Sequence, residues 1–237
     1  MAGSGSNPLG WAVVRLVETG STNDDLVRMA RDGAPAGTVL VADHQTAGRG
    51  RLDRRWEAPP GTNLLASLLL RPTDRALHHC TWTVALAARS ACATVAGVSP
   101  DLKWPNDLLV DGRKLAGLLA ESVDGAVVVG IGLNVGWAPD GATCLAASSS
   151  ARPSPIDVLA AMLPEIDRLA SGGTGALAAE YRAALATIGM DVRVERTALA
   201  PLLGRAVGVL DDGRLVVATA DGDVAVAAGD VVHLRHA

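Results

Sequence analysis

The 237-residue sequence predicts an α+β protein that ends in a small all-β unit. An Ala-rich stretch, 77–98, has the length and composition of one long helix. Asp-Gly pairs at 111–112 and 124–125 separate three apolar segments. Such pairs favour antiparallel hairpins, because both turn residues tolerate positive φ. The C-terminal part of the chain is rich in Val and interrupted by Gly, which is typical of short strands.

The sequence before the long helix predicts one short helix and two strands. Residues 21–24 read Ser-Thr-Asn-Asp, which resembles a capping box in which Asp replaces the usual Glu or Gln. Gly33 supplies the end of this helix. Apolar runs predict strands at 38–42 and 63–70, and a loop rich in Gly and Arg, 44–61, connects them.

After the long helix we expect an antiparallel meander with strands at 108–110, 114–122 and 126–135. Helical segments follow at 156–170 and 175–188. Pro164 is expected to split or kink the first of them, because proline removes a helical hydrogen bond.

The Val-rich tail begins at Asp191 and is expected to form a small barrel or sandwich. A unit of roughly 48 residues has a marginal core of its own, so it should dock on the rest of the protein. The predicted division is 1–188 for the main domain and 189–237 for a small C-terminal β-barrel.

Composition excludes several classes of protein. Hydrophobic residues make up 49% of the chain, which excludes a mainly disordered protein. The net charge of −4 argues against general binding to nucleic acid or to anionic membranes. Five Trp, one Tyr and no Phe leave too few rings for an array of base-stacking platforms.

The lack of a targeting signal and the pattern of cysteines favour a cytoplasmic protein. The N-terminal residues 1–10 show no secretory signal, and no apolar run has the length of a membrane span. Cys80, Cys92 and Cys144 are isolated and odd in number, so we interpret them as reduced thiols in the core.

The strongest concentration of charge is residues 48–56, Gly-Arg-Gly-Arg-Leu-Asp-Arg-Arg-Trp, which we call the arginine loop. Guanidinium groups pair with phosphate or carboxylate, and glycines let backbone N–H groups approach an anion. A solvated basic loop is the competing interpretation. Trp56 favours a binding site, because a scarce aromatic side chain at its end could pack over a ring or an aliphatic chain.

Three further segments place single polar side chains in apolar surroundings. In 103–107, Lys-Trp-Pro-Asn-Asp, the Asp107 carboxylate could hold Mg²⁺, which takes one or two carboxylates plus phosphate oxygens. Lys114 starts an apolar strand and is available to a developing negative charge. In 130–135, Gly-Ile-Gly-Leu-Asn-Val, Asn134 is the only residue with a polar side chain. Each segment also has a purely structural interpretation. Residues 103–107 could form a structural turn, Lys114 could be a solvated hairpin residue, and Asn134 could serve strand packing.

Familiar phosphate-binding and nucleophile motifs are missing. No GxxxxGK[ST] segment occurs, and Gly48-x-Gly50 lacks the third glycine of a dinucleotide fingerprint. No local Ser-His-Asp or Cys-His pattern is present. His78 and His79 are adjacent on the long helix, so we interpret them as ordinary helix positions rather than metal ligands.

Taken in order, these segments resemble the biotin protein ligase family. The matching residues are Ser21-Thr22-Asn23, Gln45, the loop start Gly48-Arg49-Gly50-Arg51, Trp56, 103–107, 113–117 and 130–135. Each motif alone is weak, but the series in this order and spacing is specific. The resemblance covers about 20–135, and the Val-rich tail fits the small barrel that ends these enzymes.

The resemblance implies a catalytic domain related to class II aminoacyl-tRNA synthetases, with a mixed sheet backed by helices. It also implies a two-step reaction. Biotin and MgATP give biotinoyl-5′-AMP and pyrophosphate, and a lysine amine of the biotin carboxyl carrier domain of a carboxylase then displaces AMP. No enzyme nucleophile is required.

The resemblance further implies a role for each matching residue. The residues expected to bind biotin are Ser21, Thr22, Asn23, Gln45, Arg49, Gly50, Arg51, Trp56, Lys114 and Gly117. Those expected to bind the nucleotide are Arg49, Arg51, Lys103, Asn106, Lys114 and Asn134. Lys114 and Arg49 are the expected catalytic residues, and Asp107 is the expected Mg²⁺ ligand.

The sequence departs from the family pattern at one position, and two rival functions are considered. Asp53 stands where the family usually has glycine, which adds a negative charge inside the arginine loop. A lipoate-protein ligase or octanoyltransferase of the same fold is the nearest rival, and a nucleic-acid-binding module is the second. About 20 residues precede Ser21, too few for the DNA-binding domain of some family members, so we expect no role in transcriptional repression. From the net charge and the lack of a membrane-spanning run we expect no nucleic-acid or membrane partner.

Overall fold

The structure is a computed structural model that describes residues 10–234, except 53, 73–75, 197–198 and 228. Its main body is a seven-stranded sheet with strand order β1-β2-β3-β7-β6-β5-β4. The strands are β1 (Ala12–Thr19), β2 (Thr38–Gln45), β3 (Leu64–Leu70), β4 (Asp101–Lys103), β5 (Asp107–Val110), β6 (Arg113–Val123) and β7 (Ala126–Leu133). The helices are α1 (Thr22–Arg31), α2 (Leu77–Ala96), α3 (Leu145–Ser148), α4 (Pro155–Ser171) and α5 (Thr174–Ala184).

The sheet is mixed, which confirms the predicted fold class. Strands β1 and β2 are parallel, and the remaining neighbours are antiparallel. The meander expected from the two Asp-Gly pairs is β5, β6 and β7, and Asp111 and Asp124 both adopt positive φ at its turns. Strand β1 was not expected from the sequence. It is an edge strand whose side chains are mostly exposed, with Val17 82% exposed. Its sequence therefore lacks the run of buried apolar residues that would predict a strand.

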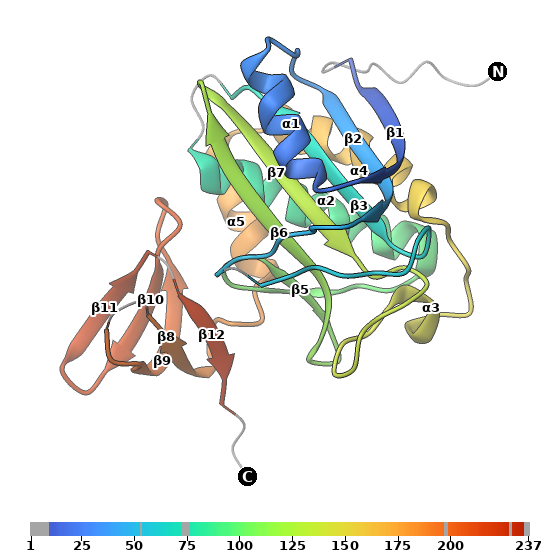
Figure 1. Ribbon diagram of the computed structural model, residues 1–237. Helices are drawn as coiled ribbons and strands as arrows, with labels where there is room; N and C mark the ends of the chain where they lie inside the picture. The colour runs from blue at the N-terminus through green and yellow to red at the C-terminus, as the bar shows by residue number, and fades with distance from the viewer. Residues whose placement is uncertain (1–9, 53, 73–75, 197–198, 228, 235–237) are drawn as a thin grey trace.

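Helices cover both faces of the sheet (Figure 1). Helix α1 packs its buried Leu26 and Ala30 against Leu40, Leu69 and Val128 on one face. Helices α2 and α4 lie on the other face, where alternate residues of the same strands are buried against them. Because it has a helical layer on each side, β3 is buried along its whole length.

The start of α1 follows from local sequence, whereas a split predicted in α4 is absent. Ser21 caps α1, and its hydroxyl accepts from the Asp24 N–H at 3.4 Å, as the capping pattern predicted. The expected split at Pro164 does not occur, because α4 runs unbroken from Pro155 to Ser171. Met162 and Ile166, on either side of the proline, are buried in the core shared with α2, and this packing holds the helix together.

The tail forms a second, five-stranded antiparallel sheet of order β11-β10-β9-β8-β12, seen beside the main body in Figure 1. Its strands are β8 (Asp191–Glu195), β9 (Leu202–Val209), β10 (Leu215–Thr219), β11 (Gly222–Val226) and β12 (Asp230–His233). Its Val-rich core joins the main core. The Trp104 indole donates to the Gly213 carbonyl at 3.0 Å, and Arg182 donates to the Val209 carbonyl at 2.8 Å. The small unit therefore docks as expected.

Other expectations concern the cysteines and the helices. Cys80, Cys92 and Cys144 are buried thiols that form no disulfide, and burial raises the pKa of Cys92 to about 12. This makes Cys92 an inert core thiol. None of the helices described is both long enough and apolar enough to cross a lipid bilayer. Within the described ranges, no group of three or more His, Cys, Asp or Glu side chains is placed to hold a metal ion.

Candidate active site

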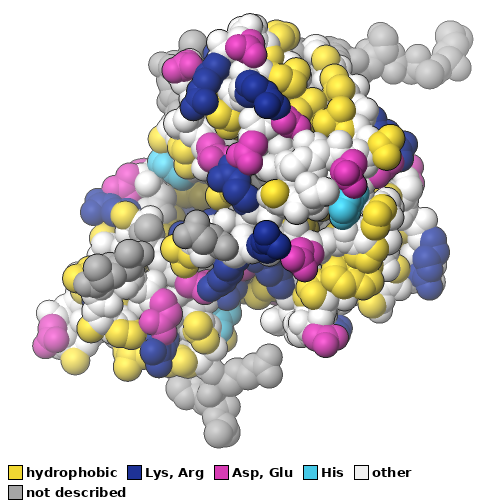
Figure 2. Space-filling model, in the orientation of Figure 1, with side chains coloured by type: hydrophobic (Ala, Val, Ile, Leu, Met, Phe, Trp, Pro, Cys, Tyr) yellow, Lys and Arg dark blue, Asp and Glu magenta, His cyan; other side chains and the backbone are white. Residues whose placement is uncertain are grey.

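A cavity of about 310 Å³ opens between the start of α1, the arginine loop, strands β5 to β7 and the edge of the small sheet. The residues predicted from the sequence that line it are Ser21, Thr22, Asn23, Gln45, Arg49, Gly50, Arg51, Trp56, Asn106, Asp107, Lys114, Gly117 and Asn134. In the space-filling view, Lys, Arg, Asp and Glu side chains gather over the middle of this face (Figure 2). Arg49 and Lys114, which are far apart in the sequence, thus share one cavity.

One end of the cavity is a polar chain at the N-terminus of α1. Thr22 donates its backbone N–H to Gln45 Oε1 at 2.7 Å, and its hydroxyl lies 3.0 Å from the same atom. The Ser67 hydroxyl lies 2.8 Å from Thr22 Oγ1 and 2.6 Å from Asn23 Oδ1. The hydroxyls of Thr22 and Ser67 supply only two protons for these three close pairs of oxygens. At least one oxygen of this polar chain can therefore accept a further hydrogen bond from a ligand.

Asn23 has a fixed orientation in this chain. Its Nδ2 donates to the Leu119 carbonyl at 3.1 Å and to Glu121 Oε2 at 2.9 Å. Gly130 lies beneath it, and a Cβ there would collide with the Asn23 amide. The glycine in β7 therefore provides the space that Asn23 occupies.

Trp56 forms one wall of the cavity by packing on two other glycines. A Cβ at Gly132 would collide with the indole, and one at Gly117 would lie 3.3 Å from it. Lys114 Nζ lies 5.7 Å from the centre of a Trp56 ring, within the range of a cation–π contact. Trp56 Nε1 is buried without a hydrogen-bond partner among the described residues, so a ligand acceptor would satisfy it.

Lys114 and Asp107 place opposite charges side by side at the cavity. Lys114 Nζ lies 2.7 Å from Asp107 Oδ1, and the side chains are 38% and 18% exposed. The pairing of β5 with β6 brings them together, with a register shift between Leu108 and Leu109. The ammonium is therefore held in place but still reachable from the cavity.

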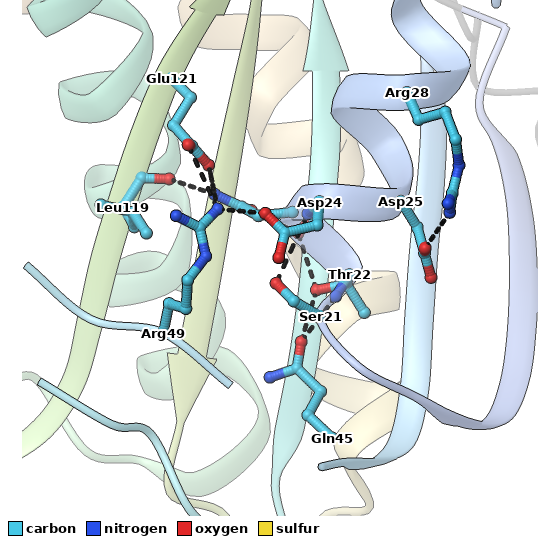
Figure 3. A network of polar contacts seen from close by, with 11 residues as sticks. Ser21, Thr22, Asp24, Asp25, Arg28, Gln45, Arg49, Leu119 and Glu121 are labelled. Carbon is cyan, nitrogen blue, oxygen red and sulfur yellow. Dashed lines mark hydrogen bonds and ion pairs between the residues drawn. The ribbon is translucent and has the colours of Figure 1, made fainter. Parts of the chain in front are cut away.

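The arginine loop is anchored on two sides. Arg49 donates from Nη2 to Glu121 Oε1 and Oε2 at 3.2 and 3.0 Å and also pairs with Asp24 (Figure 3). Arg54 pairs with Asp230 of β12. The main body and the small sheet both hold this loop.

Arg51 links the loop to the segment before β5. Its Nη1 donates to Asn106 Oδ1 at 3.1 Å, and its Nη2 to the Gly229 carbonyl at 3.4 Å. Burial lowers the pKa of Arg51, although it stays a cation, whereas the hydrogen bond with Asp230 raises the pKa of Arg54. The cationic wall therefore depends on contacts made by the C-terminal sheet.

Two predicted residues are placed differently from the rest. Asn134 lines the cavity, but its side chain accepts from Asn63 Nδ2 at 3.1 Å and donates to the Thr143 carbonyl at 3.0 Å. Lys103 is not among the lining residues. Its positive charge lowers the pKa of His233 of β12.

Sequence reasoning missed several residues of the site. Gly229 and Asp230 line the cavity from the small sheet, and no local motif marked them. Ser67 and Glu121 hold Asn23 from neighbouring positions. Ser67 is the one polar residue of the apolar strand β3, and Glu121 follows the apolar run 115–120 of β6, and these positions were the available signal. Asp53 lies outside the described residues.

Two family models match the chain. The model described as the biotin/lipoate A/B protein ligase family matches residues 17–137, and the biotin protein ligase C terminal domain matches residues 187–234. The chain is 40% identical to a biotin–[acetyl-CoA-carboxylase] ligase of Mycobacterium tuberculosis over 99% of its own length and 93% of the relative's. It is 31% identical to the bifunctional ligase/repressor BirA of Bacillus subtilis, covering 89% of this chain and 70% of BirA.

Solved structures show the same architecture. The biotin protein ligase of Aquifex aeolicus, in complex with biotin and ATP, aligns with a TM-score of 0.82 and 27% identity, covering 94% of this chain and 99% of the other. The biotin protein ligase of Leishmania major, in complex with biotinyl-5-AMP, aligns with a TM-score of 0.67 and 25% identity, covering 91% and 98%.

Proposed function

The chain belongs to the biotin protein ligase family, and from this premise we propose which of its residues carry each part of the reaction. It is an ATP-dependent biotin–protein ligase, so the first step joins the biotin carboxylate to the α-phosphate of ATP. The observation that carries our assignment is that Arg49 and Lys114 line the same cavity.

The polar end of the cavity suits the ureido ring of biotin. A ureido group offers two N–H donors and a carbonyl acceptor. Thr22, Gln45 and Asn23 form a chain rich in oxygen acceptors, and the Thr22 hydroxyl retains acceptor capacity. We place Ser21 beside them, while Trp56 and Gly117 flank the apolar body of the ligand.

The cationic end suits the reacting anions. A carboxylate that attacks a phosphate brings two negative groups together, so charge and orientation dominate the barrier. Lys114 Nζ is a compact cation at the cavity, and Arg49 uses only Nη2 in its hydrogen bonds with described protein groups. Its other donors are therefore available to an anion. In our assignment Lys114 contacts both the biotin carboxylate and the α-phosphate, and Arg49 and the Gly50 backbone flank them.

The nucleotide side is assigned to residues next to this pair. Arg51 and Asn106 are joined by a hydrogen bond at the cavity, where they can face phosphate or adenine. For Lys103 and Asn134 the support is the sequence resemblance alone. The Asn134 side chain accepts from Asn63 and donates to Thr143, so in our assignment it also holds the segment after β7 in place.

Asp107 fits the role of a Mg²⁺ ligand. It contributes a carboxylate at the cavity, and Mg²⁺ commonly takes one or two carboxylates while phosphate oxygens and waters complete its shell. When bound, the ion would reduce the negative charge of the triphosphate. Asp107 would hold it, and Lys114 keeps its position by pairing with the same carboxylate.

In the second step a lysine amine attacks the acyl carbon of biotinoyl-5′-AMP and AMP leaves with the bonding electrons. We propose the biotin carboxyl carrier domain of a carboxylase as the acceptor, in line with the name of the M. tuberculosis relative. We also propose the domain division 1–188 and 189–237 and a cytoplasmic location. The three buried cysteines, which form no disulfide, support that location.

Mass spectrometry of a purified carrier domain incubated with the protein, biotin and MgATP tests this function. The expected result is the gain of one biotinoyl group on a single lysine. Parallel reactions with lipoate or octanoate test the rival activities of the same fold. Modification by lipoate and not by biotin, or no modification with any acid, would overturn the proposal.

A further inference from the structure

Glu121 of β6 has a carboxylate that contacts two residues lining different parts of the cavity, Asn23 and Arg49. Its Oε2 accepts from Asn23 Nδ2 at 2.9 Å and from Arg49 Nη2 at 3.0 Å. Asn23 belongs to the polar chain around Thr22, and Arg49 belongs to the arginine loop. Figure 3 shows Glu121 meeting the guanidinium of Arg49, with Asp24 on the other side of that group.

The fold leaves Asn23 little freedom to move away from Glu121. Both protons of its amide are donated, to Leu119 O and to Glu121, and its Oδ1 accepts from Ser67. Rotation of the amide would place N–H groups against Ser67 and an oxygen against two acceptors. Removing the carboxylate would therefore loosen a residue that lines the cavity.

Arg49 depends on the same carboxylate in another way. Backbone hydrogen bonds from Trp56 N to Gly48 O and from Gly50 N to Arg54 O hold the loop on each side of Arg49, and the direction of its guanidinium is set by contacts of the side chain. Its contacts with Glu121 and Asp24 all use Nη2, which leaves Nη1 and Nε without a protein acceptor in the described part of the chain. The carboxylates thus hold the guanidinium by one nitrogen and leave donors for an anionic ligand.

We propose that Glu121 is a positioning residue that ties the arginine loop to the polar end of the cavity by holding Asn23 and Arg49 at once. The consequence is that contacts at Asn23 and contacts at Arg49 depend on each other. This inference rests on the proposed function, because it assigns Asn23 to the ureido end and Arg49 to the reacting anions.

Biotin-dependent ATP–pyrophosphate exchange and calorimetric biotin titration of the full chain test it. Glu121→Ala removes both contacts, and Glu121→Gln keeps an acceptor for Asn23 but loses the charge. We expect KM and Kd for biotin to rise about fivefold to tenfold in Glu121→Ala, and kcat to fall as well because Arg49 flanks the reacting anions, with smaller changes in Glu121→Gln. Glu165→Gln, which breaks a comparable pair with Arg168 on α4, is the matched control and should behave as the wild type.

A double-mutant cycle distinguishes positioning from a local effect. The changes in biotin Kd caused by Asn23→Ala and Arg49→Gln should be non-additive by about threefold or more in the wild type and additive in the Glu121→Ala background. Additive effects in both backgrounds, or Glu121 variants that match Glu165→Gln, would overturn the proposal. If Glu121→Ala does not fold, the cycle in Glu121→Gln decides. A wild-type protein without biotin-dependent exchange would instead overturn the proposed function.

Discussion

Lys114 Nζ lies 2.7 Å from Asp107 Oδ1, at the point where β5 and β6 border the cavity. One carboxylate thereby fixes the direction of a flexible four-carbon side chain. An ammonium held in this way meets a developing negative charge without first having to be ordered. The pair also joins the expected catalytic lysine to the expected metal ligand.

The first prediction concerns this lysine. Lys114→Ala should lower the rate of biotinoyl-5′-AMP formation by about a hundredfold or more, because a preorganised cation at the reacting phosphate is lost. ATP–pyrophosphate exchange measures the rate, and circular dichroism checks that the fold is unchanged. Arg168→Ala removes a cation from the exposed surface of α4 and is the control. Normal turnover in Lys114→Ala would refute the assignment.

The second prediction concerns the seat of Trp56. A methyl group at Gly132 would collide with the indole, so Gly132→Ala should displace the wall of the cavity and raise KM for biotin about tenfold. Gly208→Ala in β9 is the matched control, because a Cβ there meets nothing within 4 Å. Steady-state kinetics at saturating ATP measure both variants. Equal KM values in the two would show that Trp56 does not shape the biotin site.

The third prediction concerns the pair of Arg54 and Asp230, which ties the arginine loop to the small sheet. We propose that the arginine loop closes over the adenylate, so Asp230→Asn should make it open more often and speed the loss of biotinoyl-5′-AMP from the enzyme about threefold. The free energy of unfolding should change by less than about 1 kcal/mol, since Arg54 is 62% exposed.

Release of AMP in the absence of an acceptor measures this loss. Glu195→Gln breaks an exposed pair with Arg193 within the same sheet and should leave the rate unchanged. The charge-swapped variant, Arg54→Asp with Asp230→Arg, should restore retention. A rate in Asp230→Asn that equals the control would exclude a latch between the loop and β12.

Local signals in the sequence predicted most of the sheet, and the resemblance to the biotin protein ligase family supplied most of the predicted residues that line the cavity. The cap at Ser21 and the turns at Asp111 and Asp124 depend on neighbouring residues, so they can be identified without knowledge of the fold. Strand β1 lacks a buried pattern, because it lies at an edge.

Long-range contacts could not be predicted in this way. Asp230 reaches the arginine loop only because the small sheet docks beside it, and the docking geometry leaves no mark near Asp230 in the sequence. Glu121 meets Asn23 because β6 runs past α1 in the folded chain. The continuity of α4 through Pro164 likewise depends on its packing against α2.

His233 of β12 contacts the hydroxyl of Thr187 at 3.1 Å, and this contact can be tested by changing the pH. Burial lowers the pKa of His233, and the positive charge of Lys103 lowers it further. The unfolded chain, with a histidine pKa of about 6.5, therefore binds this proton more readily than the folded protein. Stability is unaffected by this group well above pH 6.5 and falls as the pH drops below that value.

The fourth prediction is that the melting temperature of the wild type falls more between pH 7.5 and pH 5.5 than that of His233→Gln, which has no proton to bind at this position. Lys103→Gln should show an intermediate fall, because one of the two causes of the lowered pKa is removed and burial remains. Differential scanning calorimetry at matched ionic strength measures all three proteins. An identical fall in the three would mean that His233 binds its proton equally well in the folded and unfolded chain. The charge of Lys103 would then not change the free energy of unfolding through His233.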